Sequence, residues 1–350
     1  MESTKLFFLL SFFVSLMIGQ GLGGHYPLRQ HFEVSNKLLV FGDSYVDTGN
    51  EPSEQSFINY PYGMTFPGKP DGRYSDGYVL TDYFASFLGL ESPIPYMQLY
   101  AVSRPELKDG VNFGVGGTGV FETLVSGPNI TRQIDFLEEL IDNSTLTPHY
   151  IDSSIALVSI SGNDYMTYLV RNILDLVGFI KGIKPFVRSM VDETIENLKR
   201  INSLGVKKVV VTALGPVECV PFMTFLISYE QCFPVLSLVA DYHNILLRQA
   251  VDRLNREATN DSHFSILDLH GAFSYIIQNK GYPEGNITFP TPLKPCCTGV
   301  CGQVDREGNK LYELCEDPKS AFYWDFVHPS HEGWLAAFSY LTDTDLKKSY

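Results

Sequence analysis

The sequence predicts an α/β protein with a parallel sheet covered by helices on both faces. Short runs of apolar and β-branched residues alternate along the chain with longer stretches of helical spacing. Strands of a parallel sheet are buried on both sides and are connected by helices, so they read as continuous apolar runs. With 350 residues, of which 44% are hydrophobic, the chain can bury a large core, and disorder over most of its length is excluded.

The first half of the chain contains five predicted elements. Residues 37–41 are an apolar, β-branched run and form the first predicted strand. Residues 78–88 follow with helical spacing. Residues 111–115 are a short predicted strand, residues 130–141 a helix, and residues 154–160 a second strong strand.

In the second half, six apolar residues spaced three or four apart indicate one face of a helix: Val187, Met190, Val191, Ile195, Leu198 and Ile201. Gly205 is expected to end that helix, because glycine readily adopts the left-handed conformation found there. Residues 206–213 form the next strand. Residues 236–257 are a long predicted helix, residues 263–269 a further strand, and residues 332–341 the closing helix.

Residues 1–24 are predicted to be a secretory signal peptide, which leaves residues 25–350 as a single domain. A basic start is followed by an apolar run of 13 residues, Leu6–Ile18, and then by several glycines. The alternative is a membrane anchor, but this run is too short to span about 30 Å of hydrocarbon. No later run is long enough and no retention signal ends the chain. We therefore expect a secreted, extracellular protein without stable membrane insertion.

The charge of the chain limits its partners. Lys and Arg total 26 against 40 Asp and Glu, which gives a formal charge of −14. Nucleic acid and anionic membrane surfaces require clustered positive charge, so neither is an expected partner. The expected partner is a small-molecule or lipid substrate, and oligomeric state has no signature in the sequence.

An even number of cysteines in an oxidising compartment suggests disulfides. The six are Cys219, Cys232, Cys296, Cys297, Cys301 and Cys315. The first two bracket a loop-like segment and could pair with each other. Cys296 and Cys297 are neighbours, so each is expected to pair elsewhere, with the last two as the nearest candidates. Six cysteines allow about fifteen pairings. A zinc site is the less supported alternative, because no His lies at finger-like spacing.

Four Asn-x-Ser/Thr sequons fit a glycosylated secreted protein. They are Asn129, Asn143, Asn260 and Asn286.

The first predicted strand is followed directly by Phe-Gly-Asp-Ser at residues 41–44. A serine at a turn from strand to helix exposes its hydroxyl at the sheet edge, which suits a nucleophile, so Ser44 is the candidate. The alternative is a helix N-cap, where Asp and Ser are preferred. The motif also differs from the Gly-x-Ser-x-Gly turn of α/β-hydrolases, in which the serine lies between two glycines.

Residues 324–331 near the C-terminus read Trp-Asp-Phe-Val-His-Pro-Ser-His. A serine hydroxyl needs a base to accept its proton, and the base needs a partner that fixes its tautomer. Asp325 and His328 are three residues apart, so one short loop can present an imidazole oriented by its own carboxylate. The alternatives are an ordinary turn with solvated side chains, and His331 as a competing base without an Asp three residues before it.

Two segments between these motifs offer hydrogen-bond donors. Residues 112–119, rich in glycine, supply backbone that can approach a ligand closely. Asn163 places a side-chain amide just after a predicted strand. A tetrahedral oxyanion needs two or three such donors, and removing one costs about 3 kcal/mol of barrier. The glycines also match the spacing of a dinucleotide loop, but such a loop would open a helix, and the next predicted helix starts only near Ile130.

Taken together, these segments resemble the GDSL esterase/lipase family, a branch of the SGNH hydrolases, and its plant secreted members in particular. The shared motifs are Phe-Gly-Asp-Ser, Asn-Phe-x-x-Gly-Gly, Gly-Asn-Asp and Trp-Asp-x-x-His-Pro, in this order over nearly the whole mature chain. The resemblance implies a three-layer flavodoxin-like fold with about five parallel strands, and no metal or cofactor. Ser161 and Ser330 stand where family members usually have Gly and Thr, and neither position supplies a catalytic atom.

The resemblance also implies roles for individual residues. Ser44 would be the nucleophile, His328 the base and Asp325 the acid that orients the base. The N–H groups of Ser44 and Gly116 and the side chain of Asn163 would form the oxyanion hole. The implied activity is hydrolysis of lipid or small acyl esters through an acyl-enzyme.

Two other functions are compatible with these residues. An acyltransferase would use the same triad to deliver the acyl group to an alcohol, and a non-catalytic glycan- or lipid-binding protein would keep only the fold. Aromatic residues in a Pro/Gly-rich loop beyond the nucleophile are candidates for an acyl pocket, with simple loop packing as the alternative. These residues are Phe57, Tyr60, Tyr62 and Phe66.

Overall fold

The computed structural model describes residues 37–50, 59–99, 107–172, 174–258 and 261–346. Every helix and strand given below belongs to one compact unit. The predicted signal peptide, the sequon at Asn260 and the aromatic Phe57 lie outside the described residues.

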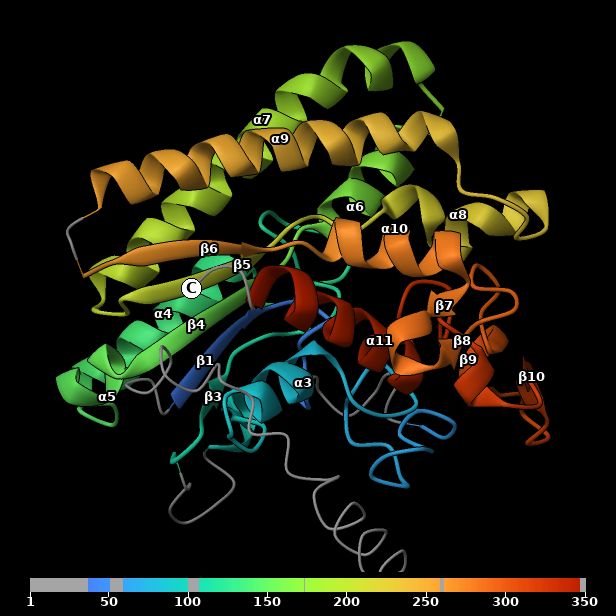
Figure 1. Ribbon diagram of the computed structural model, residues 1–350, viewed down its shortest axis with the longest axis horizontal. Helices are drawn as coiled ribbons and strands as arrows, with labels where there is room; N and C mark the ends of the chain where they lie inside the picture. Colours follow the sequence, from blue (N-terminus) through green and yellow to red (C-terminus); the bar gives the residue numbers. More distant parts are fainter. Residues whose placement is uncertain (1–36, 51–58, 100–106, 173, 259–260, 347–350) are drawn as a thin grey trace, which may run out of the picture. The chain divides into compact units, whose positions relative to one another are not determined.

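Six parallel strands form the central sheet, in the order β2-β3-β1-β4-β5-β6 (Figure 1). The strands are β1 (Lys37–Gly42), β2 (Ile94–Pro95), β3 (Gly110–Asn112), β4 (Ser154–Ser159), β5 (Lys208–Thr212) and β6 (His263–Leu267). The predicted α/β class with a parallel sheet is confirmed. Of the six strands of this sheet, the one that the sequence does not predict is β2, which is only two residues long.

β1 lies in the middle of the sheet, and later strands are added first on one side of it and then on the other. After β1 the chain builds β2 and β3 on one side, and it then crosses over to β4, β5 and β6 on the other side. In open parallel sheets, ligands bind in the crevice outside the carboxyl ends of the strands at such a change of side. Gly42 and Ser159, which are paired at the ends of β1 and β4, mark this crevice.

Helices cover both faces of the sheet, as predicted. They are α3 (Leu80–Phe87), α4 (Ile130–Asp142), α5 (Pro148–Asp152), α6 (Gly162–Asn172), α7 (Leu176–Ser203), α8 (Pro221–Thr224), α9 (Pro234–Glu257), α10 (Leu269–Asn279) and α11 (His331–Leu341). α4, α7 and α9 share one core cluster with strand residues such as Phe41 and Val158. α7 and α9 lie side by side on one side of the strands, whereas α3 and α11 contact each other on the other side (Figure 1).

Shorter elements complete the described chain. The 3₁₀ helices are η2 (Tyr96–Gln98), η3 (Val217–Cys219), η4 (Phe225–Ile227), η5 (Pro283–Gly285) and η6 (Pro318–Ser320), and a π-helical turn, η7 (Thr342–Leu346), follows α11. Two antiparallel hairpins pair β7 (Gly281–Tyr282) with β8 (Ile287–Thr288) and β9 (Cys297–Val304) with β10 (Lys310–Leu314).

Some boundaries differ from the sequence expectations for local reasons. The helix face at residues 187–201 belongs to the longer α7. β3 ends at Asn112, where the regular pairing with β1 stops because the Gly42 N–H donates to Gln133 Oε1 at 2.8 Å. The Asn112 side chain accepts the Gly114 N–H at 2.9 Å, and the Val115 N–H still donates to the Gly42 carbonyl oxygen at 3.0 Å. β6 ends before Leu269, because Asp268 caps the start of α10, a helix that the sequence reading did not separate from the strand.

Three disulfides join all six cysteines, and no free cysteine is left among them. Cys219 pairs with Cys232, Cys296 with Cys315, and Cys297 with Cys301. The neighbouring cysteines therefore pair with the two candidates expected from the sequence. The zinc alternative is wrong, because every thiol that it would use is in a disulfide.

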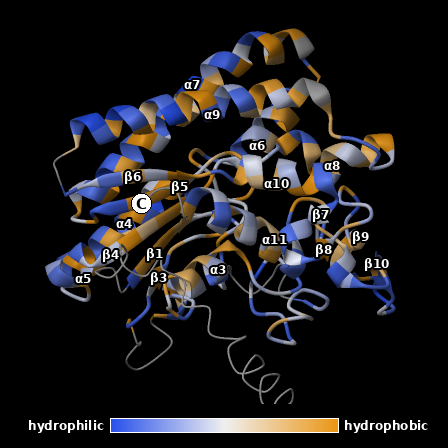
Figure 2. Cartoon of the chain, in the orientation of Figure 1, coloured by the Kyte–Doolittle hydropathy of each residue, from blue (hydrophilic) through white to orange (hydrophobic). Residues whose placement is uncertain are grey.

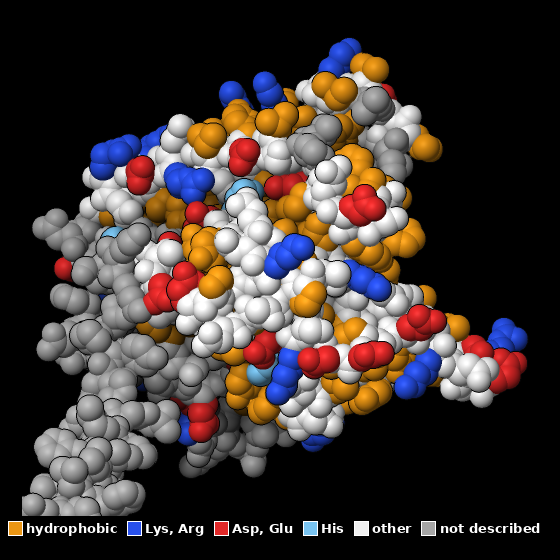
Figure 3. Space-filling model, turned by 45° about the vertical axis from the view of Figure 1, so that its right-hand side comes forward, with side chains coloured by type: hydrophobic (Ala, Val, Ile, Leu, Met, Phe, Trp, Pro, Cys, Tyr) orange, Lys and Arg blue, Asp and Glu red, His pale blue; other side chains and the backbone are white. Residues whose placement is uncertain are grey.

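Apolar residues are concentrated in the strands, whereas α7 and α9 carry both apolar and polar residues along their length (Figure 2). This is the pattern of a buried sheet flanked by amphipathic helices. Within the described residues, none of the helices combines the length and the apolar character needed to cross a bilayer. On the face shown in Figure 3, Lys and Arg are interspersed with Asp and Glu.

Candidate active site

Ser44 lies two residues beyond β1, at the centre of the carboxyl edge of the sheet. Gly42 has φ +149°, and a Cβ atom there would lie 2.0 Å from the carbonyl oxygen of Ser159, so this position requires glycine. Gln133 of α4 holds the same peptide: its Oε1 accepts the Gly42 N–H at 2.8 Å, and its Nε2 donates to the Gly42 carbonyl at 2.9 Å. Sequence reasoning missed Gln133, although an amide on the apolar face of α4 was the signal.

The loop that carries Asp325 and His328 is closed by its own hydrogen bonds. Asp325 Oδ1 accepts the N–H groups of Val327 and His328, both at 2.9 Å. The N–H of Trp324 donates to the carbonyl oxygen of His328 at 2.7 Å. The carboxylate therefore shapes the turn and, at the same time, faces the imidazole of the residue that ends it.

The structure brings the three predicted triad residues into one hydrogen-bonded line. Ser44 Oγ and His328 Nε2 are 2.8 Å apart, and His328 Nδ1 is 2.8 Å from Asp325 Oδ2. All three residues are buried. This spacing is the geometry of a nucleophile, a base and an orienting carboxylate. His331 is not part of the line, because its Nδ1 accepts the N–H of Tyr78 at 3.0 Å.

The carboxyl group of Asp325 is held in its charged form. Burial alone would raise its pKa, but the charge and hydrogen bond of His328 and the hydrogen bonds from Val327 and Tyr62 outweigh burial and lower the pKa below the ordinary Asp value. An ionised Asp325 can stabilise the imidazolium that forms when His328 accepts a proton.

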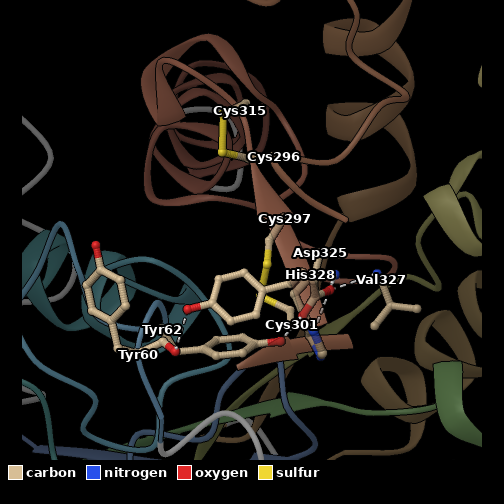
Figure 4. The surroundings of a disulfide bond; sticks show 10 residues. Tyr60, Tyr62, Cys296, Cys297, Cys301, Cys315, Asp325, Val327 and His328 are labelled. Carbon is tan, nitrogen blue, oxygen red and sulfur yellow. Dashed lines mark hydrogen bonds and ion pairs between the residues drawn. A yellow bond between two sulfur atoms is a disulfide. The ribbon is translucent and has the colours of Figure 1, made fainter. Parts of the chain in front are cut away.

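Tyr62 is a member of this network that sequence reasoning did not assign. Its Oη donates to Asp325 Oδ2 at 2.7 Å (Figure 4). Its ring lies edge-on to Trp324. It belongs to a small core cluster that includes Tyr312 and the two cysteines of the Cys297–Cys301 disulfide. The β9–β10 hairpin and its disulfides thus pack against the residue that contacts the carboxylate.

Two of the three expected oxyanion donors are available. The Ser44 N–H donates to no other described residue. Asn163 lines the same cavity as Ser44 and His328, and its Nδ2 donates to the Thr118 carbonyl oxygen at 2.9 Å. Because a side-chain amide carries two hydrogens, one remains for a ligand.

The expectation for Gly116 needs correction. Its N–H donates to Asp47 Oδ2 at 2.9 Å, so in this structure it is not free to bind an oxyanion. Gly116 nevertheless lies close to the site, because a Cβ atom there would overlap the ring of Tyr74, which packs beside His328. The next N–H, of Gly117, has no partner among the described residues, and Gly117 has φ +74°. The glycine-rich segment opens no helix, which rules out the dinucleotide loop.

An apolar cavity of about 100 Å³ adjoins Ser44 and His328. Its walls come from the carboxyl ends of β4 and β5, from α6, from η3 and from the start of α10. The aromatic loop beyond the nucleophile does not line it. Tyr60 is half exposed, Tyr62 contacts Asp325, and Phe66 packs on Tyr78. None of these three described aromatics lines the cavity, and Tyr62 has a contact with the carboxylate that goes beyond loop packing.

Three further carboxyl groups near Ser44 are buried. Desolvation raises the pKa of Asp43 to about 7 and the pKa values of Asp47 and Asp164 to about 6, although each accepts backbone N–H groups. They surround the nucleophile turn and the glycine-rich segment with groups whose charged form is disfavoured.

These raised values predict how stability depends on pH. From about pH 4 to about pH 7 the folded state binds more protons than the unfolded state at these groups, so the free energy of unfolding should fall as the pH rises. Denaturant unfolding at pH 5 and pH 8 measures this effect. Asp43→Asn should make the dependence weaker, and an equally steep fall in that variant would contradict the assignment.

The remaining predicted sites are surface positions. Asn143 and Asn286 are exposed, and Asn129 is partly buried as the N-cap of α4, where its side chain accepts the N–H of Arg132. Whether these sequons carry glycans stays a prediction. In the part of the chain that the structure describes, no three His, Cys, Asp or Glu side chains gather in a group that could hold a metal ion.

The family model described as GDSL-like Lipase/Acylhydrolase matches residues 38–341, a range that contains all the residues of the site. The GDSL esterase/lipase At5g03610 of Arabidopsis thaliana is 43% identical over 357 residues, which cover 97% of this chain and 96% of that protein. The GDSL esterase/lipase At3g09930 of the same plant is 42% identical over 355 residues, with 97% and 98% covered.

A more distant relative has a more specific name. Acetylajmalan esterase 2 of Rauvolfia serpentina is 27% identical over 346 residues, which cover 89% of this chain and 91% of that protein. The family model spans most of the chain, and the two Arabidopsis proteins match nearly all of it, so the resemblance inferred from four short motifs is confirmed. The chain belongs to the GDSL-like lipase/acylhydrolase family of carboxylic ester hydrolases.

Proposed function

We propose that the protein is a serine hydrolase that cleaves lipid or small acyl esters through an acyl-enzyme on Ser44. The observation that carries the proposal is the hydrogen-bonded line from Ser44 Oγ through His328 to Asp325. The names of the relatives, esterases and lipases, support the ester as the bond that is cleaved.

In the first half of the reaction, Ser44 Oγ attacks the ester carbonyl carbon while His328 Nε2 accepts the hydroxyl proton. Asp325 stabilises the resulting imidazolium. The carbonyl oxygen becomes an oxyanion, which accepts hydrogen bonds from the Ser44 N–H and the Asn163 amide. The tetrahedral intermediate collapses, the bond to the alcohol oxygen breaks, and His328 returns the proton to the departing alcohol.

In the second half, water replaces the alcohol. His328 accepts a proton from the water as its oxygen attacks the acyl carbon, and the same donors hold the new oxyanion. The bond to Ser44 Oγ breaks, and the serine recovers its proton from the imidazolium. We place the Gly117 N–H as the third donor, because the Gly116 N–H is engaged by Asp47.

A fluorophosphonate probe with mass spectrometry tests this proposal. The probe should label Ser44 in the folded protein and leave other serines unlabelled. A protein that binds lipid or glycan without catalysis would not be labelled. Adding a competing alcohol to the ester assay separates the two enzymatic outcomes, because a hydrolase gives mainly the free acid and an acyltransferase gives the new ester.

We further propose that the protein is secreted. The support is the signal-like segment at residues 1–24 together with the three disulfides, which are typical of oxidising compartments. N-terminal sequencing of protein recovered from the medium of expressing eukaryotic cells would show a start near residue 25. Retention of residues 1–24 in a protein that stays within the cells would contradict it.

The contact between Tyr62 and Asp325 gives a prediction for the pH profile. In Tyr62→Phe the carboxylate loses a donor, so its pKa rises and its negative charge acts more strongly on His328. The acidic limb of kcat/KM against pH should therefore move upward by about one pH unit or less. The rate well above that limb should change only a few-fold.

Tyr312→Phe is the matched control. It removes a hydroxyl from the same cluster, one that donates to the Tyr60 carbonyl oxygen at 3.2 Å and not to Asp325. A general loosening of the cluster would affect both variants alike. The same acidic limb in Tyr62→Phe, Tyr312→Phe and the wild type would show that the Tyr62 hydroxyl does not act on the carboxylate.

A further inference from the structure

We infer that the cavity beside Ser44 is the acyl pocket, that it selects short apolar acyl groups, and that Gly215 and Gly162 keep it open. This inference rests on the proposed ester hydrolysis and adds to it the class of acyl group.

The position of the cavity relates it directly to the reacting atoms. Ser44, His328 and Asn163 are all part of its lining. Its other walls are mostly apolar, and they come from segments distant in sequence: Ile160 after β4, Met166 on α6, Leu214 after β5, Val217 in η3, Val220 before α8, and Phe273 on α10. A substituent on a carbonyl carbon bound to Ser44 Oγ can therefore enter an apolar space.

The three substituents of the reacting carbon have different requirements. The carbonyl oxygen needs the Ser44 N–H and the Asn163 amide. The alcohol oxygen must meet His328 Nε2 to receive a proton, and the alcohol must then leave to solvent. The acyl chain stays attached after the alcohol has left, and burial of its methylenes in an apolar cavity is favourable. We therefore place the acyl chain in the cavity and the alcohol outside it.

The size of the cavity limits the length of the chain. Its volume is about 100 Å³. A dry cavity of about 150 Å³ in another protein accommodates benzene, which has six carbons. A smaller space suits acyl groups of about two to four carbons, and a longer chain has to extend out of the mouth, where it gains less from burial.

Two glycines of the lining contribute empty space rather than backbone flexibility. A Cβ atom at Gly215 would meet only the ring of Phe273, at 3.9 Å, and a Cβ atom at Gly162 would meet nothing within 4 Å. Neither glycine has the positive φ that would exclude other residues. Larger side chains at these two positions are therefore expected to fill the pocket without displacing the backbone.

The test measures kcat/KM for p-nitrophenyl acetate, butyrate and octanoate. The wild type should prefer acetate or butyrate to octanoate. In Gly215→Leu the ratio of butyrate to acetate should fall at least tenfold, and Gly215→Ala, the matched smaller step, should lower it less. Val220→Ala should act in the opposite direction and improve the longer esters. A second series, in which the alcohol of an acetate ester is varied, should show much smaller differences between the variants and the wild type.

Each outcome has a separate meaning. Two results would show that the cavity is not the acyl pocket, while the proposed hydrolysis would stand. One is a wild type that hydrolyses esters but prefers octanoate, and the other is a chain-length profile that Gly215→Leu and Val220→Ala leave unchanged. A change in alcohol preference instead would place the alcohol in the cavity and overturn the assignment. Failure of the wild type both to hydrolyse any ester and to label at Ser44 would refute both proposals. Thermal unfolding of each variant shows whether it is folded. If Gly215→Leu does not fold, Val220→Ala still tests the proposal.

Discussion

Replacing Ser44 by Ala should reduce ester hydrolysis by a factor of about 10⁴ to 10⁶. The variant lacks the oxygen that forms the acyl-enzyme, whereas the Asn163 amide and the cavity are retained, so a small residual rate over water is expected. Among the described residues, Ser44 Oγ forms a hydrogen bond only with His328. The fold and the thermal midpoint should therefore change little. The measurement is kcat with p-nitrophenyl acetate, together with labelling by a fluorophosphonate.

A matched control separates the loss of the nucleophile from a general effect of serine removal. Ser203 is exposed at the end of α7, and its hydroxyl donates to the Arg200 carbonyl oxygen of the same helix. Ser203→Ala should keep full activity. Activity of Ser44→Ala within tenfold of this control would remove Ser44 from the mechanism.

Replacing Asp325 by Asn should reduce kcat by a factor of about 10⁴, with substrate binding largely retained. Asp325 accepts hydrogen bonds from His328 Nδ1, from the N–H groups of Val327 and His328, and from Tyr62 Oη. An amide has only one oxygen, and its nitrogen is a donor, so it cannot accept from all of these groups. When the amide nitrogen faces Nδ1, the imidazole takes the tautomer that carries its proton on Nε2, which is useless as a base towards Ser44.

The comparison variant for this prediction is Asp142→Asn. Asp142 is exposed at the end of α4, so the exchange there tests only the loss of a carboxylate charge. We expect unchanged kcat and KM. The triad assignment fails if Asp325→Asn keeps kcat within tenfold of Asp142→Asn, or if its loss appears only in KM.

Much of the fold could be predicted because its signals are local. The strands β1, β4 and β5 are short runs, mostly apolar, whose residues are nearly all buried, as expected for inner strands of a parallel sheet. The edge strand β6 is only partly buried. β2 was missed because a strand of two residues is too short to show a periodic pattern of apolar residues. α10 was missed because Asp268, its N-cap, follows the last residue of β6 so closely that strand and helix form one apolar stretch.

The site divides in a similar way. Asp325 and His328 could be paired from the sequence, because three residues separate them and the loop closes on itself. The distance between His328 and Ser44 depends on how two segments 284 positions apart in the sequence come together at the sheet edge. From the sequence alone, this contact could be expected only because the motifs resemble those of the GDSL esterase/lipase family.

The sequence by itself determined the alternation of strands and helices and the identity of the reactive groups, because periodicity and short motifs are properties of neighbouring residues. Only the tertiary structure decided that the Gly116 N–H binds Asp47, that Tyr62 binds Asp325, and that the apolar cavity lies between β4, β5 and α10 rather than in the aromatic loop. Each of these is a contact between segments far apart in the chain. Such contacts depend on strand order and loop direction, which no local pattern specifies.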